Sequence, residues 1–412
     1  MNLINARLRH VDGLHTLSWE NRVFTAITPQ TASLPPGARD LDAQGRLVIP
    51  PLVEPHIHLD ATLTAGQPEW NMSGTLFEGI ERWSQRKQTI TVEDTKQRAH
   101  ATLRMLAEHG IQHVRTHIDV TDPSLVALQA MLQVREEARH LIDLQIVAFP
   151  QEGIESYADG RALMERAVAM GADVVGGIPH FENTREQGVS SIHFLMDLAE
   201  RHGCLVDVHC DETDDPHSRF LEVLAEQARV RGMGSRVTAS HTTAMGSYDN
   251  AYCSKLFRLL KQSGINFVSC PTESIHLQGR FDSFPKRRGV TRVAELDRAG
   301  MNVCFGQDSI MDPWYPLGNG AILRVLDAGL HICHMLGFED LQRCLDLVTD
   351  NSARTLNLGD GYGLAVGRPA SLVVLEATSD FEAVRLQAKP LLSVRGGQVL
   401  MTRTPQVVHL NA

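Results

Sequence analysis

Short apolar runs alternate with amphipathic segments through most of the chain. Between the first two runs, the segment 92–110 repeats Ala99, Leu103, Leu106 and Ala107 at helical spacing and closes on Gly110, a residue typical of helix ends. Eight strand–helix units in succession predict an α/β fold of the (β/α)8 barrel type. A doubly wound sheet is less favoured, because no glycine-rich phosphate turn follows the first run. The predicted strands lie in the runs 48–58, 111–120, 143–151, 172–181, 204–212, 236–243, 265–273 and 301–309.

The two ends of the chain have a different pattern. Residues 1–46 contain short strand-like pieces divided by turns, and the segments PASLVVLEA and LSVRGGQVLM near the C-terminus look similar. We expect both ends to pair into one small β-sandwich domain. The predicted division is therefore 1–46 plus 362–412 for the β domain and 47–361 for the barrel.

Composition narrows the classes of function. The 412 residues are 43% hydrophobic and 21% charged, which suits one large domain with a small satellite. A net charge of -10 argues against nucleic-acid binding, because a nucleic-acid interface needs a basic face. No apolar stretch suits a membrane span or a signal peptide, and the 7 cysteines form no C-x-x-C pair. We expect a cytoplasmic protein with reduced thiols and no membrane contact.

Metal-binding residue types gather where a barrel places its active site, at the C-terminal ends of strands. His56 and His58 end the first run and, two residues apart, point to the same side. His209, His241 and Asp308 end later runs. Imidazoles and a carboxylate form an N/O cage suited to Zn²⁺ or Fe²⁺, with a position left open for water. One histidine at a strand end is usually a hydrogen-bonded core residue, so the hypothesis depends on the coincidence of all five.

Three further polar residues lie at strand ends. Glu212 follows His209 by three residues, where it could be a catalytic acid or only a solvated loop carboxylate. Gln151 ends the third run. His117 is one histidine more than the metal needs, and we interpret it as structural or as a support behind the ligands.

These motifs resemble a known family. The segments PLVEPHIHLD, VDVHCDE, TASHTTAM and FGQDS are similar to the amidohydrolase superfamily, and most similar to its bacterial cytosine deaminases. The resemblance covers nearly the whole chain and extends to TAGQPEWNMSGTLFEGIERW, GADVVGGIPHFE, DPWYPLG and NSARTLNL.

The resemblance implies one divalent metal ion, Fe²⁺ or Zn²⁺, held by His56, His58, His209 and Asp308. It also implies that His241 contacts the reacting oxygen and that Glu212 shuttles protons. The substrate contacts that it implies are Gln151 at the amide edge of a pyrimidine, with Leu76, Phe149 and Trp314 as pocket walls. Two-metal relatives bridge their ions with a lysine at the fourth strand, and GGIPHFE contains none, which supports a single ion. The family further implies a homo-oligomer.

The chain departs from the family at two places. Gln307-Asp308-Ser309 stands where cytosine deaminases carry His-Asp-Asp, and 270–274 replaces a more apolar Asn-Pro-Leu-Val-Asn run. By resemblance, position 309 lies beside C5 of the bound ring, and serine removes both volume and charge there. We therefore expect a hydrolase that deaminates cytosine and 5-methylcytosine to uracil and thymine, with the methylated base favoured through Ser309.

Other functions are weighed against this one. The nearest alternative is a deaminase of another small cyclic amidine, such as creatinine, isocytosine or an aminotriazine. A cyclic-amide hydrolase like dihydroorotase is disfavoured by the missing lysine. A binding protein that had lost its metal would show broken ligands, and all of the ligands are present here.

Overall fold

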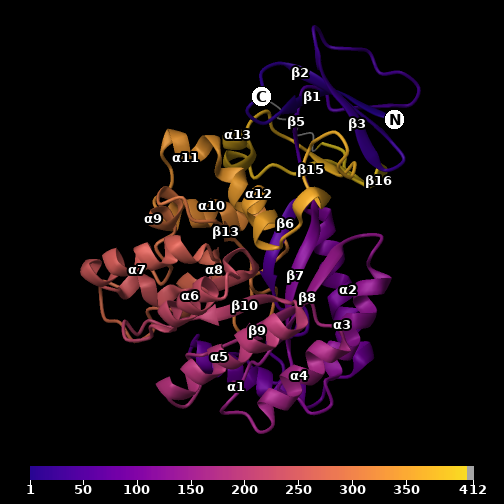
Figure 1. Ribbon diagram of the computed structural model, residues 1–412. Coiled ribbons are helices and arrows are strands. Elements are labelled where there is room, and N and C mark those ends of the chain that lie inside the picture. The colour runs from indigo at the N-terminus through magenta and orange to yellow at the C-terminus, as the bar shows by residue number, and fades with distance from the viewer. Residues whose placement is uncertain (406–412) are drawn as a thin grey trace, which may run out of the picture.

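The computed structural model describes residues 1–405 and contains two eight-stranded sheets (Figure 1). The first is a barrel whose neighbouring strands pair in parallel in chain order from β6 to β13. A bridge from Ile57 to Asp308 closes the first strand against the segment after the last. Each predicted apolar run contains one barrel strand, so the predicted fold is confirmed. The strands are β6 (Leu52–Ile57), β7 (Ile111–Asp119), β8 (Asp143–Phe149), β9 (Val174–Gly177), β10 (Leu205–Cys210), β11 (Val237–His241), β12 (Asn266–Ser269) and β13 (Val303–Phe305).

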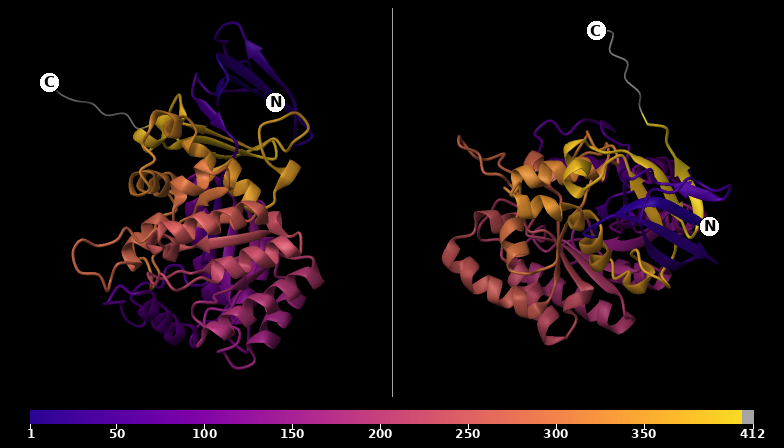
Figure 2. Two further views of the ribbon diagram at one scale, coloured as in Figure 1. Left: turned by 60° about the vertical axis from the view of Figure 1, so that its left-hand side comes forward. Right: turned by 90° about the horizontal axis from the view of Figure 1, so that it is seen from above.

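Helices that follow the strands cover the outside of the barrel (Figures 1 and 2). The helices of the whole described chain are α1 (Leu76–Lys87), α2 (Val92–Glu108), α3 (Val126–Glu137), α4 (Gly160–Met170), α5 (Arg185–His202), α6 (Phe220–Val230), α7 (Asn250–Ser263), α8 (Pro271–Leu277), α9 (Val293–Arg298), α10 (Ile322–Ile332), α11 (Phe338–Gln342), α12 (Asp350–Thr355) and α13 (Asp380–Arg385), with short 3₁₀ turns at Gly234–Arg236, Thr243–Ser247, Cys344–Val348 and Gly359–Gly361. The predicted helix over 92–110 is α2. Thr91 caps its first turn by accepting a hydrogen bond from the backbone N–H of Asp94, and Gly110 turns the chain at φ +81°.

The second sheet joins the two ends of the chain, as the sequence predicts. Its strand order is β16-β15-β14-β5-β1-β2-β3, with β4 against β1. Leu17, Trp19 and Phe24 from the N-terminal part pack against Leu372 and Val394 from the C-terminal part. The strands are β1 (Asn2–Leu8), β2 (Leu14–Glu20), β3 (Val23–Gln30), β4 (Asp40–Asp42), β5 (Leu47–Ile49), β14 (Leu372–Leu375), β15 (Pro390–Arg395) and β16 (Gln398–Thr402).

The predicted boundary between the domains differs from the structure in one respect. Leu47–Ile49, expected within the first barrel run, forms β5 and pairs with β1 and β14 of the second sheet. Pro50 and Pro51 separate it from β6, and proline cannot donate to a sheet. Residues 406–412, the last part of the predicted β domain, lie outside the described residues.

The second sheet lies at the end of the barrel away from α1, the helix that follows β6 (Figure 1). The C-terminal ends of the barrel strands therefore face away from this sheet. Within residues 1–405, every helix is too short or too polar to cross a membrane.

Candidate active site

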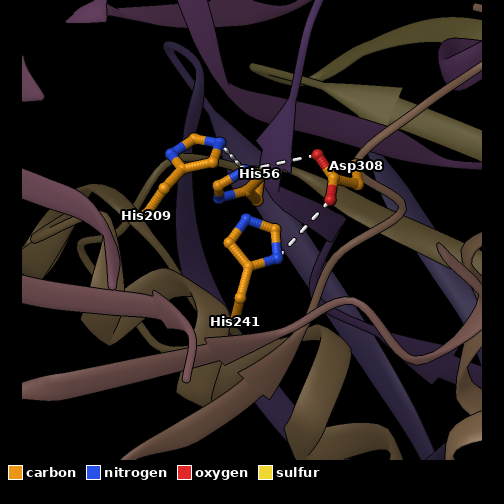
Figure 3. A group of neighbouring side chains, drawn as sticks. All are labelled: His56, His209, His241 and Asp308. Atoms are coloured by element: carbon orange, nitrogen blue, oxygen red, sulfur yellow. Dashed lines mark hydrogen bonds and ion pairs between the residues drawn. The ribbon is translucent and has the colours of Figure 1, made fainter. Parts of the chain in front are cut away.

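The ends of β6, β10 and β13 bring histidine nitrogens and one carboxylate together (Figure 3). His209 Nε2 lies 3.2 Å from His56 Nε2 and 3.1 Å from His58 Nε2. Asp308 Oδ1 lies 3.4 Å from the Nε2 atoms of both His56 and His58. All four side chains are buried. Imidazole nitrogens that face one another this closely fit lone pairs directed at one cation, so the donor set fits a divalent metal ion.

The charges of these side chains also suit a metal. Burial, together with the neighbouring imidazoles, lowers the pKa of His209 well below its usual value, so the ring is neutral and can act as a ligand. Burial alone would raise the pKa of Asp308, but His241 and His56 lower it well below its usual value. The site therefore offers a neutral imidazole at His209 and one ionised carboxylate at Asp308.

Hydrogen bonds behind His56 fix the direction of its ring. Its Nδ1 lies 3.0 Å from the Oγ of Ser240, and that hydroxyl donates a 2.6 Å hydrogen bond to Asp207. Because the hydroxyl hydrogen is used on Asp207, the serine oxygen accepts from Nδ1–H and leaves the Nε2 lone pair free for a metal. His117 stacks on His56 with ring centroids 3.8 Å apart and lies 3.5 Å from Asp207, behind the ligands.

His241 lies close to two carboxyl groups, those of Asp308 and Glu212. The Nδ1 of His241 lies 3.6 Å from Asp308 Oδ2 and 3.7 Å from Glu212 Oε1. Figure 3 shows the His241 ring directed toward Asp308. Burial and the charge of Asp308 raise the pKa of Glu212 well above its usual value. A carboxyl group with a raised pKa can accept a proton and return it during one turnover.

A pocket opens beside these groups. Its lining consists of His58, Leu76, Gln151, His209, Glu212, Glu273, Asp308 and Trp314. Phe149 instead stacks on the ring of His209, with centroids 4.0 Å apart. Ser309 instead lines a second pocket, together with Thr272 and Tyr315. The pocket therefore combines two apolar walls, one amide and several groups that can transfer protons.

Comparison with known proteins identifies the family of the chain. Residues 40–401 match the amidohydrolase family. The chain belongs to that family. It is 30% identical over 368 residues to N-isopropylammelide isopropyl amidohydrolase of Pseudomonas sp. strain ADP, with 88% of each chain covered. It is 73% identical to the crystal structure of 5-methylcytosine deaminase from Klebsiella pneumoniae liganded with 5-fluorocytosine, with a TM-score of 0.99 and 100% and 99% of the two chains covered. The structure of N-isopropylammelide isopropylaminohydrolase from Burkholderia multivorans is 28% identical, with a TM-score of 0.81 and 97% and 98% covered.

In this amidohydrolase, polar contacts hold α1 over the pocket. Trp83 Nε1 donates a 2.9 Å hydrogen bond to Asp119, and Lys87 forms ion pairs with Asp119 and Glu152. Glu152 adjoins the pocket residue Gln151. These contacts link Leu76, at the start of α1, to the ends of β7 and β8.

Sequence reasoning missed three residues of the amidohydrolase site. Asp207 lies two positions before His209 on the same strand, and the alternation used for His56 and His58 would have indicated it. Ser240 precedes His241, but no motif in the sequence indicated a role for this serine. Glu273 was noticed only as part of the unusual segment 270–274.

Proposed function

We propose that this amidohydrolase is a metal-dependent deaminase of free pyrimidine bases. It converts cytosine and 5-methylcytosine to uracil and thymine with release of ammonia, and it prefers the methylated base. The observation that carries the proposal is the pocket in which Glu212 and Gln151 flank the Asp308–histidine cluster. The 73% identity over the whole chain to a 5-methylcytosine deaminase supports it.

His56, His58, His209 and Asp308 would hold one divalent ion, Fe²⁺ or Zn²⁺. Such an ion supplies Lewis acidity that makes water nucleophilic near neutral pH. Glu212 accepts a proton from the attacking water and delivers it to the ring nitrogen N3, so that C4 becomes tetrahedral. His241 is a neutral imidazole, because burial lowers its pKa to about 3, and it stabilises the charge that develops on the new oxygen.

The remaining steps release ammonia. The second proton of the water reaches the amino group at C4, because an amine leaves poorly unless it is protonated. The C4–N bond then breaks and the carbonyl of the product forms. Gln151 pairs with the amide edge of the ring, and Leu76 and Trp314 enclose it. Water and cytosine thus become uracil and ammonia, and water and 5-methylcytosine become thymine and ammonia.

Steady-state kinetics on the two bases test the proposal. Burial of one methyl group is worth about 0.8 kcal/mol, or roughly fourfold in kcat/KM. We expect a higher kcat/KM for 5-methylcytosine than for cytosine. A kcat/KM for cytosine more than about tenfold above that for 5-methylcytosine would refute the preference. Metal analysis of the purified protein distinguishes iron from zinc.

Amine removal from a small aminotriazine is a second candidate. The 30% identity to N-isopropylammelide isopropyl amidohydrolase favours it, because that relative acts on a ring with a similar amidine–amide array. Amine release from a panel of N-isopropylammelide, isocytosine, creatinine and cytosine separates the two functions. Release from the triazine alone would replace the pyrimidine proposal.

We also expect a cytoplasmic homo-oligomer. All seven cysteines are free, as suits a reducing compartment. Light scattering on the purified protein measures the assembly, and cell fractionation measures the location.

A further inference from the structure

Three buried polar atoms beside the pocket have no hydrogen-bond partner among the described residues. They are Glu273 Oε2, Ser309 Oγ and Asp312 Oδ2, and their residues are 3%, 1% and 1% exposed. Most buried polar atoms are paired, and an unpaired one costs free energy. Three such atoms in one place therefore leave hydrogen-bonding capacity for a further polar group.

The three side chains form one cluster. Burial raises the pKa of Glu273 well above its usual value and that of Asp312 to about 7. The Ser309 hydroxyl lies near both carboxyl groups and opposes both rises, although it forms no well-aligned hydrogen bond with either. Asp312 is held in place because its Oδ1 accepts hydrogen bonds of 2.9 and 3.0 Å from the backbone N–H groups of Trp314 and Tyr315. Its Oδ2 is left without a partner.

Two members of the cluster line neighbouring pockets. Glu273 lines the pocket that also holds Asp308 and Trp314, whereas Ser309 lines the second pocket with Thr272 and Tyr315. A group carried on the bound ring toward this side therefore meets the carboxyl group of Glu273.

We propose that Glu273, Ser309 and Asp312 form a polar subsite for a hydroxyl-bearing substituent at C5, so that the enzyme also deaminates 5-(hydroxymethyl)cytosine. The inference rests on the proposed function, which places C5 beside Ser309. A hydroxyl group both donates and accepts, so it pairs with a carboxyl group in either protonation state. A methyl group offers these atoms neither a donor nor an acceptor. The reaction consumes one water at C4, breaks the C4–N bond and yields 5-(hydroxymethyl)uracil and ammonia.

The first experiment compares kcat/KM for cytosine, 5-methylcytosine, 5-(hydroxymethyl)cytosine and 5-ethylcytosine. The ethyl compound has as many heavy atoms as the hydroxymethyl compound but lacks the hydroxyl group. We expect the hydroxymethyl base to exceed the ethyl base by at least about tenfold, because a site built around polar groups rejects an apolar analogue. Equal values, or a faster ethyl base, overturn the subsite. Failure on cytosine and 5-methylcytosine would instead overturn the proposed function.

Variants of Glu273 locate the effect. Glu273→Leu removes the carboxyl group with little change in volume and should reduce the hydroxymethyl-to-ethyl ratio to within about threefold. Glu273→Gln keeps polar atoms in the same shape and should retain part of the ratio. Ile275→Ala, at a 48% exposed position on the same helix, is the matched control and should leave the ratio unchanged.

Equilibrium binding of the products gives a readout independent of turnover. Native enzyme should bind 5-(hydroxymethyl)uracil at least about fivefold more tightly than thymine, and Glu273→Leu should remove the difference. A native preference that persists in Glu273→Leu shows that Glu273 is not part of the subsite and overturns the proposal.

Discussion

Arg115 and Asp207 form an ion pair inside the barrel, with Arg115 Nη1 2.9 Å from Asp207 Oδ2 and neither side chain exposed. Burial alone would raise the pKa of Asp207, but His117 and Arg115 lower it instead. The resulting carboxylate receives the hydroxyl hydrogen of Ser240, which in turn orients His56. The ion pair thus stabilises the interior and sets the direction of a metal ligand.

Replacement of Arg115 by methionine should destabilise the fold strongly. The change leaves Asp207 charged and buried without its partner, which typically costs about 3–5 kcal/mol. Urea unfolding at pH 7 measures the change in the free energy of unfolding. Arg229→Met is the control, because Arg229 pairs with Glu226 at 42% and 43% exposure and should lose less than about 1 kcal/mol. Similar losses in both variants would contradict a structural role for the buried pair.

The barrel could be predicted because each of its strands is a run of buried residues framed by polar ones. β5 could not be separated from β6 by this signal, since Leu47–Ile49 is as apolar as the strand that follows it. For the same reason, the pattern of apolar residues could not place the boundary between the β domain and the barrel. Only the pairing of β5 with β1 and β14 decides to which sheet it belongs.

The candidate metal ligands could be predicted because strand ends converge in any barrel. Contacts across the pocket could not, because they depend on side-chain directions that packing decides. Phe149 and Ser309 are both expected from the sequence to contact the substrate. In the structure Phe149 stacks on His209, and Ser309 lines a neighbouring pocket. Glu273 reaches the pocket from the first turn of α8, a position that the strand pattern does not indicate.

Loss of one metal ligand should remove the metal and the activity together. His209→Asn replaces an imidazole whose Nε2 lies within 3.2 Å of the Nε2 atoms of His56 and His58. We expect the metal content to fall from about one ion per chain to near zero, because a catalytic site of this type has few ligands to spare. Elemental analysis measures it.

The same dependence can be tested reversibly on the native chain. A chelator should remove the metal and the activity, and added Fe²⁺ or Zn²⁺ should restore both. His331→Asn is the control variant, since His331 is 62% exposed at its side chain and belongs to α10. Full activity in a preparation free of transition metals would contradict the proposed cofactor.

Glu212→Gln should lower kcat and leave the metal bound. The amide keeps the shape of the side chain but can no longer take and return a proton, which typically costs about 10²–10⁴-fold. Turnover of 5-methylcytosine and the metal content are measured on the same sample. Glu226→Gln, at an exposed position of α6, should retain the native rate. A loss below about threefold would assign the proton transfer to another group.

Ser309→Asp should reduce activity on 5-methylcytosine more than on cytosine. The new carboxylate adds volume next to the ring and places a third acidic group beside Glu273 and Asp312. Ser309→Asn has a similar volume without the charge and separates the two causes. The ratio of kcat/KM for the two bases is the measured quantity. Equal losses on both bases would mean that position 309 does not face C5.

His113 should make the fold sensitive to mild acid. It lies on β7 against Tyr362, with ring centroids 5.7 Å apart, and burial lowers its pKa to about 4. The unfolded chain, with a histidine pKa of about 6.5, binds more protons than the folded chain between these values. Stability from this residue is therefore complete above pH 6.5 and is lost as the pH falls toward 4.

From pH 7 to pH 5, His113 should account for about 2 kcal/mol of lost unfolding free energy. His113→Phe retains an aromatic ring but cannot be protonated, so its stability should fall less over this interval. Urea unfolding at both pH values gives the two differences. His140→Phe, at an exposed position, controls for the loss of a histidine in general. If the unfolding free energy falls by the same amount between pH 7 and pH 5 in the native chain and in both variants, the acid sensitivity arises from another group.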